Sequence, residues 1–203
     1  MSAPREIVIQ AAVEGPVDEV VLGRVVRESG GVLGVVYGRN GKAHLRQRIY
    51  GYNNAAAHYP WIVLVDLDND AECAPPLREK WLPKPAQHMC FRIAVREVET
   101  WLLADREAIA RFLGVGLLAI PDSPELLYDP KQMMVTLAGR SRRRNIREDM
   151  VPRRGSGRKV GPAYTSRLIE FAGNLWTPST AALNSDSLRR CLARIAEIVS
   201  ARS

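Results

Sequence analysis

The stretch WIVLVDLDND (Trp61–Asp70) joins an unbroken apolar run to three carboxylates at alternating positions. A short run of Val, Ile and Leu without polar alternation is typical of a strand that is buried on both faces, as in a parallel sheet. Alternate side chains of a strand point to one side, so Asp66, Asp68 and Asp70 would project together wherever the strand conformation continues. The alternative is an exposed turn, because Asp-Asn-Asp is also a favourable turn sequence.

Similar apolar runs and helical patterns alternate on both sides of this stretch. Helical periodicity covers residues 16–29, 42–59, 75–82 and 96–114, with an interruption expected near Gly51. Strands are expected at 6–13, 32–38, 61–68 and 90–95. The alternation of the two predicts an α/β fold, with a mostly parallel four-stranded sheet flanked by helices.

The composition changes after Pro121. Pro, Gly, Ser and Arg dominate until about residue 163, and helical patterns return over 164–176 and 185–201. We therefore expect an α/β domain over residues 1–120. Residues 121–203 would form a helical, Arg-rich extension, consisting of a basic loop and C-terminal helices packed on that domain.

Asp66 and Asp68 fall at the carboxyl end of a predicted strand, where open parallel sheets build their sites. Hard oxygen ligands of this kind suit Mg²⁺ or Mn²⁺. A calcium loop would need Gly and Glu at the positions of Ala71 and Leu77, and a phosphate-binding loop would need Ser or Thr at Ala43. A haloacid-dehalogenase-type phosphatase would carry its aspartates after the first strand instead of the third.

A further carboxylate, Glu14, follows the first predicted strand in AAVEGPVDE (11–19). Together with Asp66-Leu67-Asp68 after the third strand, it resembles the TOPRIM domain of topoisomerases, bacterial-type primases and OLD-family nucleases. The resemblance implies a Rossmann-like fold, Glu14 as general acid/base or metal ligand, Asp66 and Asp68 as Mg²⁺ ligands, and Asp70 as a possible helper. The block IAVREVETWLLADREAIARFLG (93–114) and the tail over 160–191 resemble an uncharacterised prokaryotic family of small TOPRIM-related proteins.

Glu97 and Glu99 follow the fourth predicted strand at the same edge of the sheet. They would supply a second metal site for two-metal phosphodiester cleavage. The alternative is that Glu99 lies at the start of a helix, where an acid interacts favourably with the dipole, with Arg96 as its counter-charge. Asp18, one turn beyond Glu14, is expected on a solvated helix face.

The basic charge of the chain is concentrated in one segment. Residues 140–167 contain ten Lys and Arg against two acids, whereas the whole chain has a net charge of +7. Such a patch is the electrostatic footprint of a nucleic-acid partner, although a solvated loop is the alternative. The expected nucleic-acid-binding residues are Arg140, Arg142, Arg143, Arg144, Arg147, Arg153, Arg154, Arg158 and Lys159.

The expected function is Mg²⁺- or Mn²⁺-dependent hydrolysis of nucleic-acid phosphodiester bonds. Topoisomerase and bacterial-type primase activities are not expected, because these 203 residues leave no room for a tyrosine-bearing domain and gate and show no zinc module. The alternatives are a non-catalytic component of a prokaryotic defence-type system that binds nucleic acid or a protein partner, and a phosphatase acting on small molecules. No apolar run approaches the about 20 residues of a membrane-spanning helix, so a cytoplasmic protein is expected.

Overall fold

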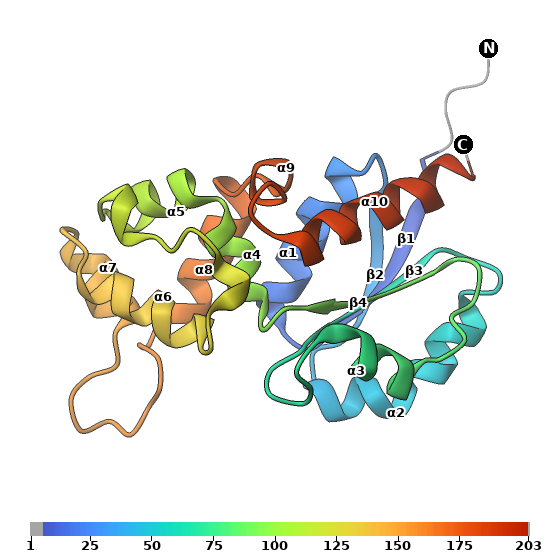
Figure 1. Cartoon of the computed structure of the whole chain (residues 1–203), viewed down its shortest axis with the longest axis horizontal. Coiled ribbons are helices and arrows are strands. Elements are labelled where there is room, and N and C mark those ends of the chain that lie inside the picture. The colour runs from blue at the N-terminus through green and yellow to red at the C-terminus, as the bar shows by residue number, and fades with distance from the viewer. Residues whose placement is uncertain (1–5, 203) are drawn as a thin grey trace, which may run out of the picture.

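The computed structural model describes residues 6–202, in which strands and helices alternate up to residue 94 (Figure 1). The elements of this part are β1 (Val8–Val13), α1 (Pro16–Glu28), β2 (Val32–Gly38), α2 (Lys42–Ala55), β3 (Trp61–Asp66), α3 (Ala74–Trp81) and β4 (Met89–Ala94). The four strands form one sheet in the order β2-β1-β3-β4, and every neighbouring pair is parallel. The predicted α/β fold with a four-stranded parallel sheet is therefore confirmed, and the architecture is Rossmann-like.

Helices cover both faces of the sheet (Figure 1). Ile62 and Leu64 of β3 pack into the larger core with α1, whereas Val63 and Val65 pack into a second core with α2 and α3. Alternate side chains of β3 thus enter different cores, which explains why this strand has no polar alternation.

The second half of the chain is helical. Its elements are α4 (Val98–Ala104), α5 (Arg106–Leu113), two 3₁₀ turns (Leu117–Ala119 and Pro124–Leu126), α6 (Pro130–Gly139), α7 (Arg144–Met150), α8 (Tyr164–Asn174), α9 (Pro178–Ala181) and α10 (Asp186–Ser200). The expectation of a basic loop is wrong for α6 and α7, which occupy much of that segment. Residues 151–163 contain no helix or strand and form the orange loop that projects from the molecule in Figure 1.

Two expected helices differ from the structure. The helix expected over 96–114 is divided at Asp105, whose side chain accepts hydrogen bonds from the backbone N–H of Ala108 (3.3 Å) and of Thr177 (3.0 Å). The interruption expected near Gly51 does not occur, because α2 continues to Ala55. An exposed glycine costs a helix only about 1 kcal/mol, which packing of the opposite face offsets.

The helices of the second half share a core with α1. The side chain of Arg24 donates hydrogen bonds to the backbone oxygens of Gly173 and Trp176, each at 2.7 Å. The indole of Trp176 donates to the Trp101 oxygen at 3.0 Å, and both indole rings are fully buried. Within residues 6–202 no helix is both long and apolar enough to cross a membrane.

Candidate functional site

Glu14 and Asp66 meet at the carboxyl edge of the sheet. Glu14 directly follows β1, and Asp66 is the last residue of β3. These two strands are neighbours at the centre of the sheet. Glu14 Oε1 accepts a hydrogen bond from the Asp66 backbone N–H at 2.8 Å, and Asp66 Oδ1 accepts one from the Val98 backbone N–H at 2.9 Å. The sheet thus joins two acids that lie far apart in the sequence, and the first turn of α4 holds the second of them.

Two more carboxylates are buried beside this pair. Asp18, in the first turn of α1, is 8% exposed, and its Oδ2 accepts a hydrogen bond from the Gly15 N–H at 2.8 Å. Glu99 of α4 is 4% exposed, and its Oε1 accepts a hydrogen bond from the Tyr164 hydroxyl at 3.2 Å. The expectation of a solvated Asp18 is wrong, because the first turn of α1 lies under the second half of the chain.

The acids at this edge hold their protons more tightly than usual. Burial is the largest cause that raises the pKa of Glu14, Asp66 and Glu99. Burial, together with smaller contributions from the charges of Glu14 and Glu99, raises the pKa of Asp18 to about 7. Their negative charges repel one another in a poorly hydrated environment, so a cation would stabilise the ionised forms.

Lys131 of α6 supplies part of that compensation. Its Nζ lies 3.2 Å from Glu97 Oε1 and 3.7 Å from Glu99 Oε1. Burial alone would lower the pKa of Lys131, but these two acids raise it above its ordinary value. Glu97 also accepts a hydrogen bond from the Lys131 backbone N–H at 3.1 Å, so Glu97 binds the start of α6 whereas Glu99 faces the buried acids.

The three aspartates of the opening motif do not share one direction. The strand ends at Asp66, and Asp68 has a left-handed backbone with φ of 50°. Lys42, at the start of α2, places its Nζ 2.8 Å from Asp68 Oδ2 and 2.7 Å from Asp70 Oδ2. Lys42 therefore offsets the charges of the second and third aspartates, while Asp66 remains with Glu14.

A pocket of about 250 Å³ opens beside these acids. Of the basic residues expected to bind nucleic acid, Lys159 lies in its wall. The full lining consists of Asp68, Asn69, Arg96, Glu97, Tyr128, Asp129, Lys131, Gln132 and Lys159.

The acids match Mg²⁺ or Mn²⁺ in donor chemistry. Among residues 6–202 no three His, Cys, Asp or Glu side chains are arranged to hold a metal ion together, so Glu14, Asp66 and Asp68 do not form a three-residue ligand set. However, Mg²⁺ is commonly bound through one or two carboxylates and keeps several waters. Asp66 and Asp68 each use one oxygen, for Val98 N–H and for Lys42, and the other oxygen of each has no protein hydrogen bond in the described chain. These two residues therefore fit such a metal.

The expected nucleic-acid-binding arginines divide into two groups. Some contact other groups of the chain: Arg143 Nη1 donates to the Phe112 oxygen at 3.2 Å, Arg147 donates to the Ser141 oxygen, and Arg144 pairs with Glu148 at 2.7 Å. The others are exposed and have no ion pair within residues 6–202. They are Arg140, Arg142, Arg153, Arg154 and Arg158.

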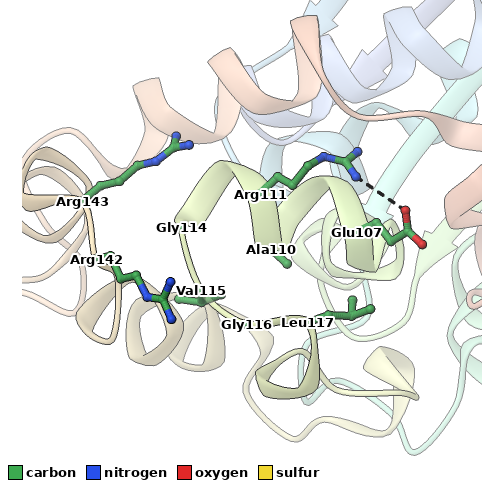
Figure 2. A pocket seen from close by; sticks show the side chains of 9 residues that line it. All are labelled: Glu107, Ala110, Arg111, Gly114, Val115, Gly116, Leu117, Arg142 and Arg143. Carbon is green, nitrogen blue, oxygen red and sulfur yellow. Dashed lines mark ion pairs between the residues drawn. The ribbon is translucent and has the colours of Figure 1, made fainter.

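Figure 2 shows Arg142, from the second group, near Arg143 from the first. Arg142 and Arg143 flank a hollow of about 620 Å³ at the C-terminal end of α5. Arg111 lies across it and pairs with Glu107 at 3.5 Å. The arginine surface therefore has a concave part at α5 and a projecting part in the loop 151–163.

Comparisons with models of protein families, with curated proteins and with solved structures find no match to this chain. The likeness to TOPRIM proteins stays a prediction from the sequence. The arrangement of the molecule itself, a Rossmann-like sheet with buried acids at its carboxyl edge and exposed arginines on the helical half, is the basis for assigning a function.

Proposed function

We propose that the chain hydrolyses nucleic-acid phosphodiester bonds in a reaction that depends on Mg²⁺ or Mn²⁺. The observation that carries this proposal is the meeting of Glu14 and Asp66 at the ends of β1 and β3, with Asp18 and Glu99 buried next to them. Four acids in so small a region repel one another, and a divalent cation offsets that repulsion and can bind a phosphate oxygen of the substrate.

Asp66 and Asp68 would hold the ion through the carboxylate oxygens that make no protein hydrogen bond. When bound, such an ion polarises a phosphoryl oxygen and lowers the pKa of a bound water. Glu14 would transfer a proton, because burial raises its pKa towards the working range of a general acid or base. Asp18 and Glu99 add negative charge around these groups.

The substrate would approach from the helical half. Arg96 and Lys159 line the pocket beside Asp68, and the exposed arginines Arg140 and Arg142, with those of the loop 151–163, extend the positive surface. A nucleic-acid backbone bound by such contacts loses affinity steeply with salt, since counterions are released on binding.

Cleavage of end-labelled single- and double-stranded DNA and RNA tests the proposal, with Mg²⁺, Mn²⁺ or EDTA. Glu14→Gln and Asp66→Asn keep the side-chain shape and the oxygens that accept the two backbone hydrogen bonds. We expect each to lower the metal-dependent rate by at least about 100-fold. Asp70→Asn is the matched control and should retain most activity, because within residues 6–202 the Asp70 side chain has no ion pair or hydrogen bond other than that with Lys42.

Two results would contradict the proposal: no cleavage by the native chain with either metal, or cleavage that is equal in the native chain and in Asp66→Asn. Binding without cleavage would instead favour the alternative function, a nucleic-acid-binding component without catalysis. The exposed arginines support that alternative, because they can bind the phosphates of a nucleic acid without a metal ion.

A further inference from the structure

The pocket beside the acids contains one exposed aromatic side chain. Tyr128 is 76% exposed, and its hydroxyl has no hydrogen-bond partner in the described chain. Its backbone is nevertheless well anchored. Leu127 packs on the core, Asp129 accepts a hydrogen bond from the Gln132 N–H at 2.8 Å, and Pro130 is buried at the start of α6. The ring is therefore presented to solvent by a fixed segment.

The same pocket also contains cations that can hold an anion. Of its three acids, Asp68 is paired with Lys42, Glu97 is paired with Lys131, and Asp129 accepts the Gln132 backbone N–H at the start of α6. Arg96 and Lys159 line the pocket without an ion pair among residues 6–202. The Arg96 side chain is oriented by a hydrogen bond from Nη1 to the Asp68 backbone oxygen at 3.2 Å. Two cations with no acidic partner thus share the pocket with an exposed ring.

We propose that this pocket binds one unpaired nucleotide of a single-stranded nucleic acid, with the base stacked on Tyr128 and a phosphate held by Arg96 and Lys159. This inference rests on the proposed nucleic-acid substrate and specifies that the bound part of it is single-stranded. It assigns to Tyr128 a role in substrate binding.

The exposed ring of Tyr128 and the small volume of the pocket together exclude the binding of a base that is paired in a duplex. A base inside a duplex is already stacked on its neighbours, so an aromatic side chain can reach its face only where the strand is single or open. The volume of about 250 Å³ is on the scale of one nucleotide and far below that of a duplex segment. Stacking tolerates any base, so the pocket would select single strands without selecting a sequence.

Fluorescence anisotropy in EDTA tests the inference without cleavage, with a labelled oligonucleotide and a hairpin duplex of the same composition. The single strand is measured both as DNA and as RNA, and the comparison uses whichever binds more tightly. We expect Tyr128→Ala to weaken single-strand binding by about 5- to 150-fold. Tyr128→Phe should restore it, and duplex affinity should stay unchanged.

Tyr59→Ala is the matched control, because Tyr59 is 65% exposed but precedes β3 at the opposite edge of the sheet. Lys159→Gln should reduce the slope of log K against log salt by about 0.7, the value for one lost phosphate contact on a single strand. Both Tyr128 and Lys159 are exposed, so these variants are expected to fold.

The inference is overturned if Tyr128→Ala binds single strands as tightly as the native chain, or if it loses single-strand and duplex affinity equally. It is also overturned if Tyr128→Phe behaves like Tyr128→Ala, or if the native chain binds no nucleic acid. A chain that binds single strands through Tyr128 but never cleaves them refutes the proposed hydrolysis alone. The two proposals can therefore fail separately.

Discussion

Asp18→Asn tests directly whether the acids at the sheet edge destabilise the folded chain. Asp18 is 8% exposed, and its Oδ2 accepts the Gly15 N–H at 2.8 Å. Asparagine has nearly the same shape, and its side-chain oxygen can accept the same hydrogen bond while the charge is removed. We expect this variant to be more stable than the native chain at pH 8 in the absence of divalent metal.

The size of the effect follows from the pKa. An unfolded aspartate has a pKa near 3.8, and in the folded chain burial raises that of Asp18 to about 7. The folded chain therefore binds more protons than the unfolded chain between these values, so its free energy of unfolding falls as the pH rises from about 4 to about 7. At about 1.4 kcal/mol per pH unit, this loss reaches about 4 kcal/mol. Asp18→Asn should gain up to that amount at pH 8 and almost nothing at pH 4.

Urea denaturation in EDTA, followed by tryptophan fluorescence at a series of pH values, measures the free energy of unfolding. Glu28→Gln is the matched control, since Glu28 lies on the exposed side of the same helix, and it should stay within about 0.5 kcal/mol of the native chain. The reasoning is refuted if the difference between Asp18→Asn and the native chain does not grow between pH 4 and pH 8. It is also refuted if the variant is less stable at pH 8, which would mean that the charge of Asp18 is well compensated.

Three further substitutions probe other parts of the structure. In Gly161→Ala the new Cβ would lie 2.4 Å from a main-chain oxygen at the end of α7. We expect the free energy of unfolding, measured by urea denaturation, to fall by at least about 2 kcal/mol. Gly116→Ala is the control and should change little, because a Cβ there would meet nothing within 4 Å. Asp105→Ala removes an N-cap and a second backbone hydrogen bond, and should lower the free energy of unfolding by about 2 to 3 kcal/mol; a loss below 0.5 kcal/mol would contradict the capping role. Tyr164→Phe removes the hydroxyl that donates a hydrogen bond to Glu99, so the pKa of Glu99 should rise further. The free energy of unfolding should fall by about 1 to 2 kcal/mol at pH 8. Equal stability of the variant and the native chain would contradict this role of the hydroxyl.

Much of the fold could be predicted because its strands are short apolar runs between helical patterns. The expected strand at 32–38 matches β2, and the expected strand at 61–68 extends only two residues beyond β3. Helices α6 and α7 were not expected, since Pro and Arg dominate their surroundings. Pro130 starts α6, where proline is well tolerated, and α7 has only seven residues, too few to show a clear period.

The site was predictable only where strand ends determine it. Glu14 and Asp66 follow parallel strands, so their meeting at one edge follows from the topology. The burial of Asp18 could not be read from the sequence, because an acid in the first turn of a helix looks the same whether or not later parts of the chain cover it. Its one local signal is the spacing from Gly15, at which an acid in the first turn can accept the backbone N–H of the N-cap residue. Asp68 forms an ion pair with Lys42, and its own backbone has the left-handed conformation. The sequence pattern, which predicts an extended strand as far as residue 68, does not reveal this conformation or the ion pair.

The packing of α1 has a consequence for how the chain folds during synthesis. All four strands have been made once residue 94 is complete, but α8 and α10, which pack on α1, are made last of all. A nascent chain with a complete sheet therefore still exposes the side of α1 that α8 and α10 cover in the finished structure, and exposed apolar surface is prone to aggregation. The last helices act as the closing step of folding, and a ribosome-bound chain that is stalled before residue 164 should be a substrate for chaperones.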